Sequence, residues 1–421
     1  MARFSSNVKL LQQIDGTLGV LACFLLTQLR RLLDAFQHEE SGAEPKKILF
    51  VKLAEQGSTV LAHEAIRQAV AKVGAKHVYF LLFEENRFIL DLMQLVPHEN
   101  VLTIRTRSPW EMIKSGLRRM LQIRRLDVDA CIDMEFFARA TSVIAWLSGA
   151  RTRVGFHAFF GEGPYRGNLF THRVLNNAHL HASRAFTSLV MALENASTNF
   201  PTFPVVPPKG DALPFFEPAA DERQEMEAVL ASLMPSGKNR LVLLNANASD
   251  LLPLRRWDEA NYLALAKRLL AEFDDLCIGF TGAPEEQAKT DELVRAVGTP
   301  RCFCLAGKTT LRQLLIIYGL ADVLVTNDSG PAHFATMTPI DVVALFGPET
   351  PLLFGAASPR NHALWAGIAC SPCVNALNNR QTTCRNNLCM QMITVEQVFT
   401  TVCELIHDRN QEPLQLHHSQ N

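Results

Sequence analysis

The stretch "ILFVKLAEQGSTVLAHEAIRQAVAKVG" (residues 48–74) decides the fold class of this chain. Residues 48–53 are almost continuously apolar, which is typical of a strand buried on both faces of a parallel sheet. After a polar loop, apolar side chains recur at helical spacing through residues 59–72, which predicts an amphipathic helix. A buried strand that leads into a helix is the first half of a βαβ unit, so the stretch predicts a parallel α/β sheet.

The same alternation continues on both sides of a proline-rich break. Residues 196–220 contain six prolines, which is typical of a linker between domains. Further strands are predicted at residues 77–83, 128–134, 241–247, 276–282, 302–307, 323–327 and 341–347, and a helix at 140–150. No internal repeat is evident. We therefore expect two doubly wound Rossmann-like α/β domains facing each other across a cleft, with ligands beyond the carboxyl ends of the strands.

Length and composition set the broad class. The chain has 421 residues, of which 48% are hydrophobic and 20% charged, and its formal net charge is −1. These values are typical of an ordinary globular protein and do not favour nucleic acid as a partner. Ten cysteines without a secretory framework favour reduced thiols in the cytoplasm. Four of them form a C-x2-C…C-x4-C pattern that could hold a structural zinc or remain free or redox-active: Cys370, Cys373, Cys384 and Cys389.

The N-terminus contains an apolar run, residues 18–29, followed at once by Arg30 and Arg31. The run is shorter than the roughly 20 residues that span a bilayer. It also lacks a convincing small-residue cleavage site of a signal peptide. We interpret it as a helix lying in the membrane interface, with Lys9, Arg30 and Arg31 near the lipid headgroups. The alternative is a helix packed on the protein's own surface.

A second stretch, "VLVTNDSGPAHFATMTPIDVVALFGPETP" (residues 323–351), places a polar turn between two apolar strands. Pro331 suits the first turn of a helix, and Asp328 or Ser329 could cap that helix. Free N–H groups at a helix start form a site for phosphate groups. The alternative is a capped strand-to-helix turn without a ligand.

Several ordered motifs resemble those of glycosyltransferase family 9, the lipopolysaccharide heptosyltransferases. The family's D-[ST]-G-P-x-H-x-A segment is similar to residues 328–335, and its F-G-P to residues 346–348. Its K-R-W segment is similar to "LPLRRW" at 252–257, and its L-x-G-x-T-x-x-x-L segment to "LAGKTTLRQLL" at 305–315. The resemblance extends over nearly the whole chain after residue 45.

The resemblance implies a GT-B fold and an inverting transfer that uses neither a metal nor another cofactor. The donor would be a nucleoside-diphosphate sugar, with ADP-heptose the family's best-known donor. The acceptor would be a lipid-linked saccharide of the cell envelope, met at the inner face of the cytoplasmic membrane. Asp127 and Asp129 form a D-x-D that could suggest the metal site of the other glycosyltransferase fold, but we interpret them as the charged start of a strand.

The expected domain roles follow from the resemblance. Residues 1–44 would associate with the membrane, and residues 45–200 would form the acceptor-side domain. Residues 201–235 would provide the linker and a connecting helix, residues 236–410 the nucleotide-sugar domain, and residues 411–421 a tail.

Three residues are expected to perform the chemistry. Arg255 occupies the place of the family's lysine before the tryptophan, and would stabilise the leaving diphosphate. Asp328 would accept N–H groups or a sugar hydroxyl. The family has an aspartate base after the loop glycine, but here Ser58 follows Gly57, so we assign the base to Glu55. Glu55 could instead be structural, paired with Lys52 or Arg139.

The remaining expected contacts to substrates are Gly57, Ser58, Ser329, Gly330, His333, Glu286, Thr309, Arg139 and Arg166. Arg139 and Arg166 would hold an anionic acceptor together with the loop near residues 151–174, unless that loop is merely solvated. Capping would explain Thr309, and a partly buried helix position would explain His333. The loss of the aspartate leaves a second hypothesis, a catalytically degenerate relative that binds a nucleotide sugar or glycolipid without turnover. An unrelated nucleotide-binding protein is disfavoured, because neither a P-loop nor G-x-G-x-x-G occurs.

Overall fold

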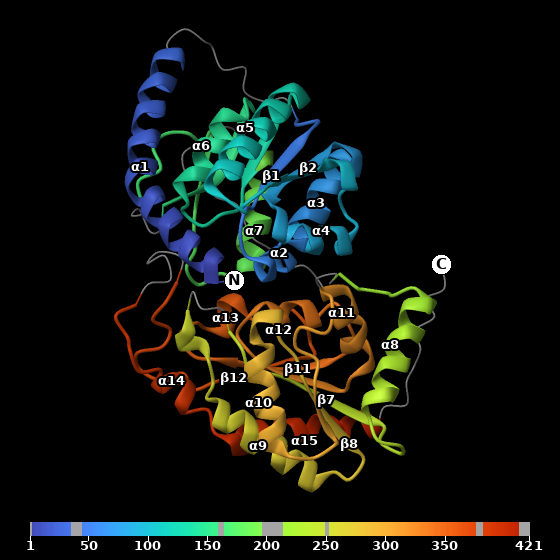
Figure 1. Ribbon diagram of the computed structural model, residues 1–421. Coiled ribbons are helices and arrows are strands. Elements are labelled where there is room, and N and C mark those ends of the chain that lie inside the picture. The colour runs from blue at the N-terminus through green and yellow to red at the C-terminus, as the bar shows by residue number, and fades with distance from the viewer. Residues whose placement is uncertain are drawn as a thin grey trace. The chain divides into compact units, whose positions relative to one another are not determined.

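The computed structural model describes residues 2–34, 44–158, 164–195, 214–248, 252–375 and 382–411. The chain divides into two compact units (Figure 1). Unit 1 contains residues 1–214 with 352–354 and 375–381, and unit 2 contains residues 215–351, 355–374 and 382–421. The main division falls inside the segment for which the prolines predicted a linker. Much of that linker and residues 412–421 of the predicted tail lie outside the described residues.

Unit 1 is built on a parallel sheet of six strands in the order β3-β2-β1-β4-β5-β6. The strands are β1 (Ile48–Val51), β2 (Val78–Phe83), β3 (Val101–Ile104), β4 (Ala130–Asp133), β5 (Thr152–Ala158) and β6 (His172–Leu175). Every residue of β1 and β4 is buried, as expected for central strands covered on both faces. The direction of strand succession reverses between β1 and β4, which is where doubly wound sheets bind ligands.

Helices cover both faces of this sheet (Figure 1). One face holds α5 (Pro109–Leu126) and α6 (Arg139–Leu147), and the other holds α2 (Gln56–Leu61), α3 (His63–Val73), α4 (Arg87–Met93) and α7 (Ala182–Met191). Beneath α5 and α6, Leu49 and Val51 of β1 pack with Ile123 and Ala145 of the helices. The start of α5 is fixed by Ser108, whose hydroxyl accepts a hydrogen bond from the backbone N–H of Glu111.

Helix α1 (Ala2–Asp34) packs against α6. On its inner face Cys23 and Thr27 are buried, and Arg30 donates to the carbonyl oxygens of Asn168 at 2.7 Å and Phe170 at 2.9 Å. The prediction that Arg30 lies near lipid headgroups is therefore wrong, because its guanidinium is used inside the domain. The alternative of packing on the protein's own surface holds for this face of the helix.

The outer face of α1 is apolar and exposed, with Leu18, Leu21 and Leu25 each more than half accessible to solvent. Among the described residues, the segment Gln13–Leu33 has the length and mean hydropathy, 1.3, of a helix that could cross a membrane. It is thus longer than the apolar run of residues 18–29 suggested. The same segment contains the side chains that fasten α1 to unit 1.

Unit 2 repeats this architecture with the order β12-β11-β10-β7-β8-β9, again parallel throughout. Its strands are β7 (Arg240–Asn245), β8 (Leu276–Phe280), β9 (Cys302–Cys304), β10 (Val323–Asn327), β11 (Asp341–Phe346) and β12 (Asn361–Trp365). Strand succession reverses between β7 and β10, as it does between β1 and β4 in unit 1. The two units thus share one topology, although the sequence shows no evident repeat.

The helices of unit 2 also form two layers. One layer contains α8 (Ala220–Leu233), α11 (Leu311–Leu320) and α12 (Gly330–Ala335), and the other contains α9 (Glu259–Glu272), α10 (Gln287–Val297) and α15 (Val395–Gln411). Two short helices remain: α14 (Leu388–Gln391) belongs to unit 2, whereas residues 352–354 of α13 (Pro351–Phe354) belong to unit 1. Trp257 anchors the core by an edge contact with Tyr262 and by donating its indole N–H to Ile393 O at 2.8 Å.

The predicted fold class of two doubly wound α/β domains is confirmed. The predicted strand at residues 323–327 coincides with β10. The predicted helix at 59–72 is two helices, α2 and α3. The backbone N–H of Ala62 donates to Thr59 O, three residues earlier, at 3.1 Å, and this tighter turn separates the two helices.

Candidate functional site

The carboxyl ends of β10 and its two neighbours, β7 and β11, lie at one edge of the unit 2 sheet. Three charged residues follow these strands. Arg255 lies in the turn Pro253–Arg255 after β7, Asp328 comes directly after β10, and Glu349 follows β11 by three residues. Topology therefore brings together residues that are far apart in the sequence.

Arg255 contacts both acids. Its Nε lies 3.4 Å from Asp328 Oδ2, and its Nη2 lies 2.8 Å from Glu349 Oε1. The guanidinium side chain is 16% exposed, whereas the carboxylate side chains are 5% and 2% exposed. One cation thus faces two buried carboxylates, so the group has a surplus of negative charge when both acids are ionised.

This arrangement shifts the pKa of all three groups. Burial raises the pKa of Asp328, and it raises the pKa of Glu349 to about 7, with Arg255 opposing both shifts. Burial disfavours the charge on Arg255, but Asp328 and Glu349 outweigh it and raise the pKa of the guanidinium above its ordinary value. Arg255 therefore stays cationic, while the two acids can hold a proton between them near neutral pH.

Asn327 fixes the loops around this group. Its Oδ1 accepts the backbone N–H of Trp257 at 2.9 Å, and its Nδ2 donates to Asn247 O at 3.1 Å. The neighbouring Arg256 donates to Ala248 O at 2.8 Å. Of the two adjacent arginines, Arg256 fastens a loop while Arg255 faces the acids. The predicted role of Arg255 at the leaving diphosphate stays a prediction.

The turn after β10 differs from its prediction. Within the described stretch 252–375, Ser329 gives α12 no side-chain cap, and its hydroxyl donates instead to Asn327 O at 3.0 Å. The capping prediction is thus wrong for Ser329, and the Asp328 carboxylate faces Arg255 instead. Because α12 has only six residues, its dipole is a weaker aid to phosphate binding than expected.

The other residues predicted to contact the donor are Gly330, His333, Glu286 and Thr309, and each lies within the local structure of unit 2. Gly330 packs closely on Phe334, whose ring would lie 3.1 Å from an added Cβ. His333 is buried on α12. Glu286 accepts the N–H of Ala283 at 2.7 Å and so caps the turn Pro284–Glu286. Thr309 precedes Thr310, which is the residue that caps α11.

In unit 1, Glu55 occupies the corresponding loop after β1. Its backbone has φ 68° and ψ 86°, an unusual conformation for a residue with a side chain. Ser58 donates to Glu55 O at 2.9 Å and lies 3.3 Å from its carboxylate, and Gly57 lies with Ser58 in α2. Such backbone conformations cost roughly 1–3 kcal/mol and cluster at active sites. Glu55 itself is exposed, so its side chain is accessible to a substrate.

Lys52 and Arg139, the suggested structural partners of Glu55, have other carboxylates beside them. Lys52 is buried with its Nζ 3.7 Å from Glu135 Oε1, and the same oxygen accepts the N–H of Ala54 at 2.9 Å. Arg139 lies 3.5 Å from Asp15 of α1. Glu135 therefore holds the loop after β1, a positioning role that the sequence analysis did not identify.

Arg166 is fully buried, away from any surface where it could grip an acceptor. It forms an ion pair with Asp133 at the end of β4 and donates to Ala138 O at 2.6 Å. Burial raises the pKa of Asp133 to about 6, with Arg166 opposing the shift. Thr141 donates to the same carboxylate at 2.8 Å. The position of Arg166 fits a residue that shapes the loop rather than one that contacts a substrate.

The D-x-D of residues 127–129 and the four late cysteines are the two sets of residues that could suggest a metal site. Asp129 of the D-x-D accepts the N–H groups of Lys46 and Lys47 at 3.0 and 2.9 Å, and Asp127 ends α5. Among the described residues, no group of three or more His, Cys, Asp or Glu side chains is placed to hold a metal ion. The four cysteines of the late pattern are free thiols in this structure: Cys370, Cys373, Cys384 and Cys389.

Glu349 is the site residue that sequence reasoning missed. It follows the F-G-P of residues 346–348, which drew attention to the motif but not to the acid after it. The signal that could have found it is topological. Strands that neighbour each other in a parallel sheet end at the same edge, so a polar residue after β11 belongs with one after β10.

Comparison with known proteins identifies the family. The sequence profile of glycosyltransferase family 9 (heptosyltransferase) matches residues 117–383, which is more than half of the chain. Lipopolysaccharide heptosyltransferase 2 of Salmonella typhimurium is 35% identical over 101 residues, covering 24% of this chain and 29% of that protein. Across the curated relatives it matches, the chain spans 29 to 53% of their length.

Solved structures share the fold. The Escherichia coli ADP-heptose lipopolysaccharide heptosyltransferase II has a TM-score of 0.66 at 19% identity, over 86% of this chain and 99% of that one. The E. coli heptosyltransferase WaaC, solved with ADP-2-deoxy-2-fluoro heptose, has a TM-score of 0.57 at 17% identity, over 85% and 99% of the two chains. The ordered motifs, the paired doubly wound sheets and the profile match converge, and the chain belongs to glycosyltransferase family 9.

Proposed function

We propose that this protein is an inverting glycosyltransferase that moves a sugar from a nucleoside-diphosphate donor to a lipid-linked saccharide of the cell envelope. The observation that supports it most is the Arg255 guanidinium, held by Asp328 and Glu349 at the edge where the unit 2 strand order reverses. A planar guanidinium is suited to bind two phosphate oxygens at once. It would stabilise the charge that develops on the diphosphate as the sugar leaves.

ADP-heptose is the donor that we propose. The relatives in the family are heptosyltransferases, and WaaC of E. coli was solved with an ADP-heptose analogue. The acceptor would be met at the inner face of the cytoplasmic membrane, with the protein attached peripherally through the exposed apolar face of α1. The expected chemistry needs no cofactor, because leaving-group stabilisation and proton transfer are both within reach of side chains.

Glu55 is the proposed base for the acceptor hydroxyl. Its carboxylate is exposed beside Ser58, which donates a hydrogen bond to the Glu55 loop. A carboxylate is ionised near neutral pH, whereas a serine hydroxyl needs its own base. Ser58 would therefore orient Glu55 rather than replace the aspartate found in many family members.

The test is the release of ADP from ADP-heptose in the presence of a lipid-linked core-saccharide acceptor. Glu55→Gln should lower turnover by about a hundred- to ten-thousandfold, the usual effect of removing a general base, while donor affinity stays close to that of the wild type. Ser58→Ala should cost much less. Near wild-type turnover in Glu55→Gln would move the search for the base to Glu135 and Asp328, since Asp133 is fully buried against Arg166.

The replacement of the usual aspartate by Ser58 favours one second candidate, a relative that binds a nucleotide sugar without turning it over. The two candidates differ in one measurement. A non-catalytic binder would show thermal stabilisation by ADP-heptose but no ADP release in the wild type or in Ser58→Asp. Release by the wild type rules out the non-catalytic candidate.

A further inference from the structure

Helix α5 of unit 1 exposes its apolar stripe instead of burying it. Trp110, Ile113, Leu117 and Leu121 recur at helical spacing and are 72%, 52%, 63% and 62% exposed. An amphipathic helix of a globular domain ordinarily turns such a stripe toward the core. The opposite face of α5 is the one that holds it in place, since Ile123 is fully buried and Arg119 donates to Thr103 O at 3.0 Å. The apolar stripe therefore stays exposed to solvent, while the opposite face of α5 packs against the domain.

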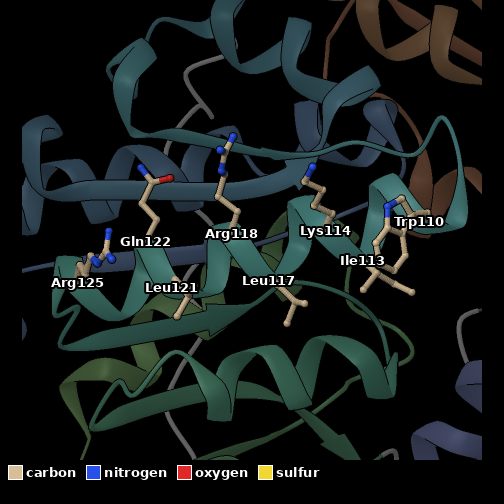
Figure 2. Close-up of a pocket in the computed structure, with 8 residues that line it drawn as sticks. All are labelled: Trp110, Ile113, Lys114, Leu117, Arg118, Leu121, Gln122 and Arg125. Atoms are coloured by element: carbon tan, nitrogen blue, oxygen red, sulfur yellow. The ribbon is translucent and has the colours of Figure 1, made fainter.

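Basic side chains run beside the stripe. Lys114, Arg118 and Arg125 line the same shallow surface pocket as the apolar residues (Figure 2). In Figure 2, Lys114 and Arg118 project to one side of the helix and Leu117 and Leu121 to the other. The sequence of α5 contains five Lys and Arg residues and one acid, Glu111. The surface is thus both apolar and positively charged.

We propose that this face of α5 is a docking surface for an anionic lipid bilayer. A helix lying in the membrane interface inserts apolar and tryptophan side chains at the level of the headgroups, while lysine and arginine beside them meet the lipid phosphates. On the exposed surface of α5, Trp110 provides the tryptophan, Leu117 an apolar side chain and Lys114 a cation. This surface adds a second contact to the one proposed for α1, and it does not depend on the proposed catalysis.

Two observations favour lipid over other occupants. A second copy of the chain pairing through α5 would bring together two helices that each contain five cations and one acid, and like charges repel. The second observation is that α1 also exposes leucines, among them Leu18 and Leu25, so unit 1 has two exposed apolar helix faces. Both α1 and α5 contact α6 (Figure 1). An acidic protein partner is the remaining occupant, and the experiment separates it from lipid.

The test measures binding of the full chain to vesicles of phosphatidylcholine with and without 30% phosphatidylglycerol. Two variants remove one property each: Trp110→Gln with Leu117→Gln and Leu121→Gln, and Lys114→Gln with Arg118→Gln and Arg125→Gln. Glutamine is a good helix former, so α5 should persist. A matched control, Leu388→Gln with Met392→Gln, removes exposed apolar side chains from unit 2.

The basic-residue variant should lose about a hundredfold in affinity for anionic vesicles, since each cation near such a surface contributes about 1 kcal/mol. The apolar variant should lose at least about tenfold. The unit 2 control should bind like the wild type. Brominated lipids should quench a fluorescence component that Trp110→Phe lacks, a readout that a protein partner would not give.

Wild-type binding by both α5 variants would overturn the proposal, as would an unquenched Trp110. If only Leu18→Gln with Leu25→Gln weakens vesicle binding, α1 alone makes the contact and the α5 assignment fails. An α5-dependent dimer formed without lipid would also overturn it. Donor stabilisation by ADP-heptose, measured on the same variants, should be unchanged, so failure of the proposed function and failure of this surface are distinguishable.

Discussion

Arg255 compensates two carboxylates that unit 2 has taken out of water. Removing one member of such a buried group leaves uncompensated charge, which typically costs about 3–5 kcal/mol. We therefore expect Arg255→Ala to lower the free energy of unfolding by about that amount at pH 8, which lies above the pKa of about 7 of Glu349. Arg255→Lys should lose less, because the charge remains while the planar fork is lost. Chemical denaturation measures both.

Arg256→Ala is the matched control for this prediction, because Arg256 lies next in the chain and donates to Ala248 O rather than facing the acids. It should cost about 1 kcal/mol, the usual contribution of a hydrogen bond. Equal stability of Arg255→Ala and wild type at pH 8 would show that Asp328 and Glu349 do not rely on the guanidinium.

Glu349 should make stability depend on pH in a window that its pKa defines. The folded-state pKa is about 7, above the ordinary value of 4.5. Between these values the folded protein holds a proton that the unfolded chain has released. Stability from this group is therefore present below pH 4.5 and lost as pH rises through 7, by about 3 kcal/mol in total. Glu349→Gln should flatten that part of a melting-temperature profile.

The comparison that checks this is wild type against Glu349→Gln at half-unit steps from pH 4.5 to 8. The variant should gain on the wild type as pH rises, because it has no carboxylate to ionise. Parallel profiles would mean that another group, such as Asp328, takes the proton. Near pH 8 the variant should also bind ADP more tightly, since Glu349 no longer competes for Arg255.

At the scale of elements, helix α1 is held by a close approach that depends on a glycine. Gly167 has φ +64°, and an added Cβ would lie 2.7 Å from Cys23 O of α1. Thr27 bridges the same place, accepting the N–H of Asn168 at 2.8 Å. Gly167→Ala should destabilise unit 1 by more than about 1 kcal/mol, because alanine suits neither this backbone nor this contact.

Gly74→Ala is a useful control for Gly167→Ala. Gly74 also has a positive φ, 81°, but nothing lies within 4 Å of an added Cβ. Gly74→Ala therefore reports what a side chain at positive φ costs without a steric contact. A loss below about 1 kcal/mol in Gly167→Ala would mean that α1 is not held at Gly167.

Burial explains part of the difference between the strands that the sequence predicted and those that it did not, although β3, which is buried along its whole length, was not predicted either. Strand β10 reads "VLVTN" with every residue buried, so its apolar run was visible. Strand β12, "NHALW", is only partly buried along its length, and β5 contains Arg153 and His157 among its residues. An edge strand such as β12, or a strand that contains both polar and apolar residues such as β5, forms because it pairs with a neighbouring strand. A single sequence does not show that pairing.

The site was predictable to the extent that it lies in motifs. Arg255 and Asp328 were identified from residues whose order resembles a known family, and the structure brings them within 3.4 Å. Glu349 and the pairing of Asp133 with Arg166 were not predicted, because no local sequence motif indicates them. Their partners lie 94 and 33 positions away in the chain, and only the sheet order brings them together.

At the scale of the whole molecule, the proposed function assigns the donor to unit 2 alone. Amide hydrogen exchange with and without ADP tests this assignment, because a bound ligand raises protection where it orders the backbone. Protection should increase in the loops around Asn247, Trp257 and Asp328, which hydrogen bonds already link to one another.

At a hundred times its dissociation constant ADP should add about 2.7 kcal/mol of stability. The loop of residues 52–58 in unit 1 should exchange at an unchanged rate, and Arg255→Lys should diminish the protection in unit 2. Protection confined to residues 52–58 would place the nucleotide in unit 1 and overturn the assignment of Arg255 to the leaving diphosphate.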